Sequence, residues 1–350
     1  CALKLAMPLA VLSAMREAGQ AHITVKGGKF LEAVAAADVI VFDKTGTLTH
    51  ACPRVETVIP FGGRKETEML RLAACLEEHF PHSMANAVVE EAKRRGLTHD
   101  EYHSKVEYLV AHGIVSTVNG ERVLIGSAHF VFEDEGCVVP PEDQARFAAL
   151  PEQYSHLFLA VGGELAAVIC ISDPVREEAA DVLAALRNMG ISKTVMLTGD
   201  SQRTAASIAA QLGVDEFRAE VLPADKAQFV AQLRQEGHTV LMVGDGINDS
   251  PALSEADAGI AISDGAALAR EIADITIAAD TLWELVELRR IAMALMARIH
   301  SNYRFVIGFN SGLIALGVSG ILAPATSATL HNLSTLGVSL RSMTKLPHTK

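Results

Sequence analysis

The longest hydrophobic stretches lie near the two ends of the chain, on either side of a polar body. Residues 303–322 carry one charge, at Arg304, and a helix of about 20 residues spans the roughly 30 Å of a bilayer core. Residues 325–340 carry no formal charge and follow a break at Pro324. We therefore predict two carboxyl-terminal transmembrane helices. A buried helix pair is the alternative, because polar residues such as Asn310 dilute the hydropathy.

The first 15 residues are apolar except for Lys4, and they are too few to cross a bilayer. We interpret them as the inner half of a membrane helix that begins upstream. A signal peptide and a lipoprotein beginning at Cys1 are alternatives, and both conflict with the missing initiator methionine. The five cysteines form no CxxC pair, which disfavours a disulfide framework or a structural zinc site and favours a reducing compartment.

Three short apolar runs in the polar body each end in a turn that contains aspartate. They are residues 39–42, which precede Asp43, and the runs within residues 194–201 and 239–249. Such runs are typical of buried parallel strands, and helical patterns precede the later two. We therefore predict an α/β fold with one doubly wound parallel sheet, whose ligands bind at the carboxyl ends of the strands. About 120 residues separate the first run from the others, too many for a crossover connection, so they predict an inserted domain.

The composition narrows the functional classes. Hydrophobic residues make up 49% of the chain and the mean hydropathy is +0.25, which supports a segment in lipid. The 42 acidic residues outnumber the 30 basic ones, for a formal net charge of −12. No electrostatic attraction to a phosphate backbone is available, so we expect no nucleic-acid partner.

Asp43 lies where the first predicted strand ends and is followed by Lys44, Thr45 and Gly46. A carboxylate at this place can attack a phosphoryl group in line and form an acyl phosphate. Glycine in the turn lets the backbone approach the phosphate closely. Asp43 is therefore the candidate nucleophile.

The other turns supply polar partners for this reaction. Thr198 is a candidate for hydrogen bonding the transferring phosphoryl group, and Asp200 for catalytic or interdomain hydrogen bonds. Asp245 and Asp249 offer the hard oxygen ligands that Mg²⁺ prefers. Lys226, in PADKAQFV, is a candidate phosphate-facing cation. Each of these residues alone is ordinary, because Asp-Gly pairs are common in turns.

Taken together and in order, the three turns resemble a known family. DKTGTLT at 43–49, TGD at 198–200 and GDGINDSPAL at 244–253 match the signatures of heavy-metal-transporting P-type ATPases, in the haloacid-dehalogenase superfamily. The resemblance covers essentially the whole chain and implies that ATP phosphorylates Asp43. The Mg²⁺ ligands that it implies are Asp43, Thr45, Asp245 and Asp249. The catalytic residues that it implies are Asp43, Lys44, Thr45, Thr198, Gly199, Asp200 and Lys226.

Thr45 distinguishes this chain from soluble phosphatases of the same superfamily. Those enzymes usually carry a second aspartate two positions after the nucleophile, where it acts as a general acid and base. With threonine at that position, the acyl phosphate should last longer, as coupling to transport requires. The main alternative is a membrane-tethered phosphatase. A non-catalytic membrane protein that binds metal through Cys1 and His331 is a further one.

The resemblance also implies an ATP site in the inserted domain. Heavy-metal pumps carry a His-Pro pair in a helix that helps hold adenine, and His82 matches that histidine with Ser83 in place of proline. The implied nucleotide-binding residues are Glu78, His82, Gly113 and Gly126. A single helix over residues 75–92 would instead place Cys75, Glu78, His79 and His82 on one face, as a metal site or a structural face.

The ends of the chain carry the candidates for the transported ion. Cys1 matches the last member of the Cys-Pro-Cys type of tripeptide in the family, and a thiolate favours soft metals. His331, in HNLST, stands where copper pumps have methionine, and the aspartate typical of zinc and cadmium pumps is missing. We predict a divalent transition-metal cation in preference to Cu(I), bound by Cys1 and His331.

The resemblance divides the chain into five segments. They are the end of a truncated transmembrane helix (1–26), a phosphorylation domain in two parts (27–51 and 171–290), a nucleotide-binding domain (52–170) and two transmembrane helices (291–350). The Thr-Gly-Glu loop of the family's actuator domain does not occur in the sequence, so we expect a partner amino-terminal half. We expect the protein in the plasma (inner) membrane, with its catalytic domains in the cytoplasm.

Overall fold

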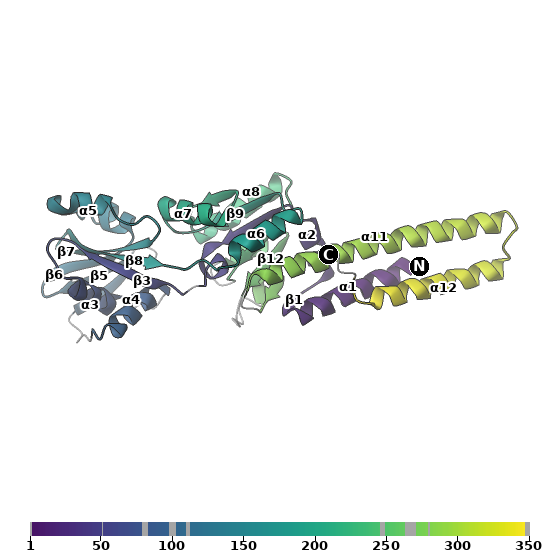
Figure 1. Ribbon diagram of the computed structural model, residues 1–350, viewed down its shortest axis with the longest axis horizontal. Coiled ribbons are helices and arrows are strands. Elements are labelled where there is room, and N and C mark those ends of the chain that lie inside the picture. Colours follow the sequence, from purple (N-terminus) through teal and green to yellow (C-terminus); the bar gives the residue numbers. More distant parts are fainter. Residues whose placement is uncertain are drawn as a thin grey trace.

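The computed structural model describes residues 2–50, 52–78, 83–97, 103–109, 113–245, 249–262, 271–278 and 281–346. Its three parts follow one another along the longest axis of the molecule (Figure 1). A six-stranded sheet with its helices lies at one end, a seven-stranded sheet lies in the middle, and a long helical hairpin extends from the other end.

The central sheet confirms the predicted parallel arrangement. In the described residues its strand order is β1-β13-β12-β11-β2-β9-β10, and all neighbours pair in parallel except β1 and β13. The three predicted runs form β2, β9 and β11, which are adjacent. The strands are β1 (Ile23–Val25), β2 (Val39–Asp43), β9 (Lys193–Leu197), β10 (Glu216–Arg218), β11 (Val240–Gly244), β12 (Ala258–Ile262) and β13 (Ile275–Ile277).

Alternate residues of the central strands enter two hydrophobic cores, one on each face of the sheet. Ile40 and Phe42 of β2 join the core on one face, whereas Val39 and Val41 join the core on the other. This alternation follows from the two-residue repeat of a strand and explains why the whole of β2 is apolar until its last residue. The first core is covered by α2 (Gly28–Ala36), α6 (Ala179–Asn188) and α7 (Gln202–Leu212), and the second by α8 (Pro223–Gln235) and α9 (Ser250–Glu255).

The insertion forms a separate antiparallel sheet with cores on both faces. Its strand order is β3-β8-β7-β6-β5-β4, and α3 and α4 cover one face. Its strands are β3 (Arg54–Pro60), β4 (His103–Leu109), β5 (Gly113–Val118), β6 (Glu121–Gly126), β7 (Ser155–Val161) and β8 (Glu164–Ser172). Its helices are α3 (Glu66–Glu77), α4 (Ser83–Arg94), the short η2 (His129–Asp134) and η3 (Pro141–Asp143), and α5 (Gln144–Ala148).

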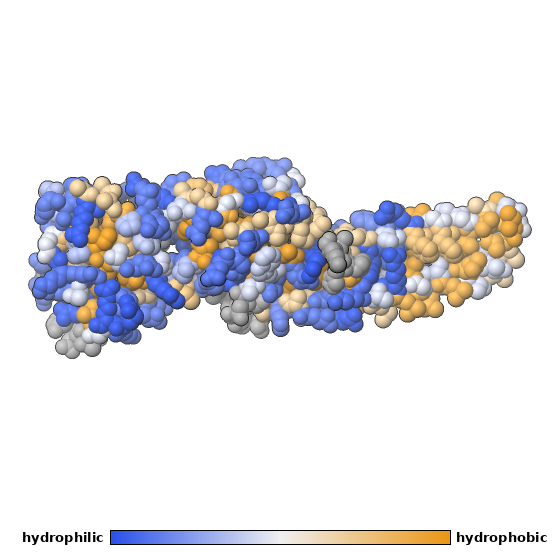
Figure 2. All heavy atoms as spheres, in the orientation of Figure 1, coloured by the Kyte–Doolittle hydropathy of each residue, from blue (hydrophilic) through white to orange (hydrophobic). Residues whose placement is uncertain are grey.

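The terminal helices are α1 (Ala2–Gln20), α11 (Trp283–Val318) and α12 (Pro324–Met343). The apolar stretch at 303–322 comprises the distal half of α11 and the four residues that follow it. The helix itself begins at Trp283, and its first turns pack on the central core through Leu285, Leu288 and Ile291. Hydrophobic side chains gather over the distal parts of α11 and α12 (Figure 2). No helix in the described ranges combines the length and the mean hydropathy expected of a membrane span.

Candidate functional site

The candidate nucleophile lies at the carboxyl edge of the central sheet. Asp43 is the last residue of β2, Thr198 directly follows β9, and Asp245 directly follows β11. Because these three strands are parallel neighbours, their carboxyl ends meet, and the three predicted turns form one site. The chain leaves Asp43 through a tight turn in which Gly46 has φ +75°, a conformation that glycine adopts without steric cost.

Lys226 lies between two buried carboxylates at this edge. Its Nζ donates to Asp43 Oδ1 at 2.5 Å and to Asp249 Oδ1 at 2.7 Å. The exposed fractions of the three side chains are 9% for Lys226, 8% for Asp43 and 1% for Asp249. The sequence predicted Lys226 as a phosphate-facing cation, and the structure places it in direct contact with the candidate nucleophile.

Burial and neighbouring charges shift the pKa values of Asp43, Asp249 and Lys226. Burial, followed by the charge of Asp249, raises the pKa of Asp43 to about 7, and the charge of Asp245 adds to the shift. Burial also raises the pKa of Asp249. Burial by itself would lower the pKa of Lys226, but the two carboxylates outweigh it and the net shift is upward. The lysine therefore stays charged, whereas the carboxylates resist full ionisation.

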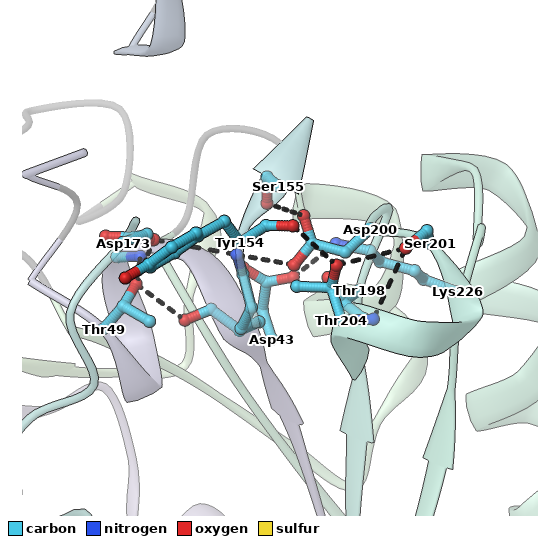
Figure 3. Close-up of polar contacts among 12 residues, drawn as sticks. Asp43, Thr49, Tyr154, Ser155, Asp173, Thr198, Asp200, Ser201, Thr204 and Lys226 are labelled. Carbon is cyan, nitrogen blue, oxygen red and sulfur yellow. Dashed lines mark hydrogen bonds and ion pairs between the residues drawn. The ribbon is translucent and has the colours of Figure 1, made fainter. Parts of the chain in front are cut away.

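A second polar network lies beside the first. Lys44 Nζ is 2.7 Å from Asp200 Oδ2 and 3.8 Å from Asp173 Oδ2, and the Lys44 side chain is 4% exposed. Thr49 donates to Asp173 at 2.6 Å, and the backbone N–H of Asp200 donates to the Thr198 hydroxyl at 3.1 Å (Figure 3). The sequence pointed to Lys44, Thr198 and Asp200.

Asp173, Thr49 and Ser155 are members of the second network that sequence reasoning missed. Asp173 directly follows β8, where the chain returns from the inserted domain to the central sheet. The position of Asp173 where the chain leaves the insertion was the sequence signal available for it, because Thr49 lies where the chain enters the insertion. Ser155 donates to Asp200 at 3.0 Å from the inserted domain, and no local pattern marks it.

The profile of the haloacid dehalogenase-like hydrolases matches residues 37–257, which include both networks. The chain belongs to this family. The match begins just before β2 and ends just before β12, so it includes the inserted sheet.

Comparison with curated proteins and solved structures extends the likeness to the terminal helices. The chain is 40% identical to the zinc-exporting P-type ATPase of Mycobacterium marinum, over 97% of this chain and 46% of that protein. It is 37% identical to the manganese-exporting P-type ATPase of Mycobacterium leprae, over 97% and 47%. A solved zinc-transporting PIB-type ATPase in its E2.Pi state aligns with TM-score 0.74 and 33% identity, over 99% of this chain and 56% of that one. The chain thus spans about half the length of these relatives, and the resemblance to heavy-metal P-type ATPases is confirmed.

The donor set at the carboxyl edge of this hydrolase site fits a hard divalent cation. In the described part of the site, Asp249 Oδ2 is buried and has no hydrogen-bond partner. A Cβ at Gly244 would come within 2.7 Å of this oxygen, so the absence of a side chain at this position leaves room for the Asp249 carboxylate. The charges of Asp245 and Asp249 raise the pKa of neighbouring carboxyl groups at this site, and a bound Mg²⁺ would offset this repulsion between negative charges.

The predicted Mg²⁺ ligands have suitable oxygen donors, but their side chains do not converge on one point in the described structure. Thr45 is exposed, next to the buried Asp43 and Lys44. No set of three or more His, Cys, Asp and Glu side chains in the described residues has the geometry of a metal site. Lys226 Nζ lies between Asp43 and Asp249. The assignment of Asp43, Thr45, Asp245 and Asp249 to Mg²⁺ stays a prediction.

The predicted nucleotide-binding residues belong to the inserted domain. Gly113 and Gly126 pair across β5 and β6, and a Cβ at Gly113 would lie 2.5 Å from both the Ile125 carbonyl oxygen and the Phe130 ring. His82 lies outside the described residues. A continuous helix over 75–92 is not formed, because α3 ends at Glu77 and α4 begins at Ser83.

The end of α3 separates two adjacent glutamates, Glu77 and Glu78. Glu78 is exposed just beyond the helix, whereas its neighbour Glu77, which the sequence interpretation did not select, is 2% exposed. Cys75 is also buried, so Cys75 and Glu78 do not form the shared exposed face that a continuous helix would give. Gly199, in the TGD turn, is exposed.

Of the two candidates for the transported ion, Cys1 lies outside the described residues. His331 of α12 lies against α11, where its Nδ1 and Asn310 Oδ1 are 2.8 Å apart. A hydrogen bond of this kind is made when Nδ1 carries the proton, which leaves Nε2 with a free lone pair. The Ser334 and Thr335 hydroxyls both donate to the backbone carbonyl of His331.

Proposed function

We propose that this chain is the catalytic and carboxyl-terminal half of an ATP-driven transition-metal transporter that works through an aspartyl phosphate. The observation that carries the proposal is the buried Asp43 at the end of a parallel strand, bonded to Lys226 at 2.5 Å and followed by Thr45 rather than a second aspartate. The family membership and the likeness to metal-exporting P-type ATPases support it.

In the proposed reaction, Lys226 holds Asp43 through Oδ1, and Asp43 Oδ2 attacks the γ-phosphorus of ATP. A bond forms between Oδ2 and phosphorus while the bond from phosphorus to the bridging oxygen breaks, and ADP leaves with that electron pair. Lys226 and the Thr198 hydroxyl offset the charge of the transferring group. Thr198 is 2% exposed and anchored on the backbone N–H of Asp200, so its hydroxyl is pre-positioned.

The charge balance of the site explains why a divalent cation is expected with ATP. Among the residues that the structure describes, five carboxylates line the site, from Asp43, Asp173, Asp200, Asp245 and Asp249, and two ammonium groups oppose them, from Lys44 and Lys226. When bound, Mg²⁺ would supply the remaining positive charge that a nucleotide phosphate needs here. Asp249 and Asp245 are the side chains we assign to hold it, together with Asp43 and Thr45.

The lifetime of the phosphorylated intermediate distinguishes transport from the alternative function, phosphate-ester hydrolysis. A general acid or base two residues after Asp43 would speed its release, and Thr45 lacks a group that titrates near neutral pH. We therefore infer that the phosphorylated state lives long enough to bias the helices joined to the central sheet. The α11 helix is suited to this coupling, because its first turns are part of the central core.

We also infer that the parts of α1, α11 and α12 distant from the central core lie in a membrane in the whole protein, together with helices of an amino-terminal half. The exposed apolar side chains on the distal hairpin support this inference, among them Ile314, Val318, Ile321, Leu333, Leu336 and Leu340. The plasma (inner) membrane, with the catalytic domains in the cytoplasm, is the location we propose. A partner half would carry the actuator function.

For the transported ion we propose a divalent transition metal. Identity alone does not select the ion, because the zinc exporter is 40% identical, a probable copper exporter of Mycobacterium tuberculosis 38% and the manganese exporter 37%. An imidazole beside an amide oxygen, from His331 and Asn310, suits borderline divalent ions better than Cu(I). Cys1 is the second ligand we propose.

The test of the catalytic proposal is phosphorylation of the 350-residue chain by γ-³²P-labelled ATP with Mg²⁺. We expect an acid-stable, hydroxylamine-labile product that Asp43→Asn abolishes. Asp225→Asn, which changes an exposed aspartate beside Lys226 in α8, is the matched control and should be phosphorylated normally. Turnover of p-nitrophenyl phosphate without any trapped phosphoenzyme would favour the phosphatase alternative.

The ion is tested in a full-length transporter that contains this chain. ATPase activity is measured with Zn²⁺, Mn²⁺, Co²⁺, Fe²⁺ and Cu(I) in turn, and we expect stimulation by one or more of the divalent ions. Stimulation by Cu(I) alone would overturn the proposed ion class while leaving the catalytic proposal intact.

A further inference from the structure

The inserted domain is joined to the central sheet by two chain segments that run side by side. Leu48 accepts a hydrogen bond from the Arg176 N–H at 2.9 Å, and Thr49 and Val175 form an antiparallel bridge. The pairing continues into the insertion, where Arg54 of β3 lies opposite Ser172 of β8. The two connections thus form one narrow ribbon, and a ribbon of this kind permits rotation of one domain against the other.

Further contacts away from the ribbon join the two domains, among them two hydrogen bonds and the exposed pair of Arg203 and Glu152 at 3.4 Å. The Ser155 hydroxyl, at the start of β7, donates to Asp200 Oδ1 at 3.0 Å, and the Thr204 hydroxyl donates to the Tyr154 carbonyl oxygen at 3.1 Å. Tyr154 and Ser155 belong to the inserted domain, whereas Asp200 and Thr204 belong to the central one. We name these two hydrogen bonds the interdomain contact.

The interdomain contact is built on an anchored acceptor. The other oxygen of the Asp200 carboxylate pairs with Lys44 at 2.7 Å, and Lys44 directly follows the nucleophile Asp43. Thr204 is 3% exposed, and Ser201, the N-cap of α7, accepts from its backbone N–H. A change in the position of the inserted domain therefore acts on a carboxylate that is itself held beside the nucleophile (Figure 3).

We propose that Ser155 is a positioning residue for phosphoryl transfer, which holds the inserted domain at the angle that delivers the γ-phosphate of its nucleotide to Asp43. The proposal rests on the proposed function. Ser155 acts through Asp200 and touches neither the nucleophile nor Lys226. A hydrogen bond to a charged acceptor is worth more than one between neutral groups, so its loss should open the domains measurably.

The first experiment measures phosphoenzyme formation in Ser155→Ala by rapid quench at saturating ATP and Mg²⁺. We expect the rate to fall about tenfold, the effect of one charge-assisted hydrogen bond. The dissociation constant of a non-hydrolysable ATP analogue should stay within about twofold of the original, because Ser155 holds the domain angle and not the nucleotide. Ser155→Thr keeps the hydroxyl and should restore the rate.

The matched control is Thr281→Ala. Thr281 also donates to a carboxylate, Glu284 Oε2 at 2.7 Å, but both residues lie at the start of α11 and belong neither to the inserted domain nor to the ribbon. Its loss removes the same kind of bond without crossing the domain interface, so the rate should not change. An equal fall in Ser155→Ala and Thr281→Ala would overturn the proposal, as would an unchanged rate in Ser155→Ala.

The second experiment reads the domain angle without any catalysis. Spin labels at the exposed positions Glu121 and Gln235, in a background with Cys1 and Cys52 replaced by serine, report the interdomain distance by double electron–electron resonance. Ser155→Ala should broaden this distance distribution, and Ser155→Thr should narrow it again. If the unaltered chain forms no phosphoenzyme, the proposed function fails, and the distance distributions alone still decide whether Ser155 fixes the domains.

Discussion

Replacing Lys226 by methionine removes the cation that lies between two buried carboxylates and keeps a side chain of similar length. Lys226 Nζ lies 2.5 Å from Asp43 and 2.7 Å from Asp249, and all three side chains are less than one tenth exposed. Breaking a buried ion pair by removing one partner costs about 3–5 kcal/mol, because the remaining charges are left without compensation. We expect Lys226→Met to lower the free energy of unfolding of the central domain by this amount at pH 8.

The assay is urea unfolding followed by the fluorescence of Trp283, the single tryptophan of the chain, which lies where α11 joins the central domain. A double-mutant cycle with Asp43→Asn isolates the pair. With one carboxylate neutralised, the added cost of Lys226→Met should fall by about 1–3 kcal/mol, as expected for residues in direct contact. A loss below about 1 kcal/mol, together with additivity in the cycle, would refute the view that this lysine compensates buried charge.

Three further predictions concern protonation, thiol chemistry and helix anchoring. Because the pKa of Asp43 is raised from 3.8 to about 7, its contribution to stability without Mg²⁺ is complete below about pH 4 and is lost as the pH rises to 7. The urea concentration at the midpoint of unfolding, measured in EDTA, should therefore fall as the pH rises over this range, and added Mg²⁺ should reduce this pH dependence. A midpoint that does not change with pH in EDTA would contradict the raised pKa of Asp43. Burial raises the pKa of Cys170 to about 11, so iodoacetamide at pH 8 should label the exposed Cys52 and spare Cys170 in the folded chain, as peptide mass spectrometry can check. Arg289 donates to backbone carbonyls at the ends of α2 and α6, so Arg289→Leu should lower the free energy of unfolding in urea by about 1.5–3 kcal/mol. The same change at its exposed neighbour Arg290 should cost less than about 1 kcal/mol. Equal costs would rule out the anchoring role.

The strands that carry the site were predictable because their signal is local. A strand buried on both faces favours apolar side chains at every position, and β2, β11 and the last three residues of β9 show this pattern up to a polar turn. The start of α11 was missed for the opposite reason. Its first turns mix buried apolar residues such as Leu285 with charged ones such as Arg289, so average hydropathy does not separate them from the domain that they cover.

The sequence by itself determined which residue types gather at the candidate site: a strand-end aspartate, two further aspartate turns and a threonine in place of a second acid. These follow from backbone sterics and residue chemistry within a few positions. The tertiary structure alone decided that Lys226 reaches Asp43 across 183 positions and that Ser155 meets Asp200 across the domain ribbon. Such contacts depend on how distant elements cross and in which direction each side chain points, and no local pattern encodes either.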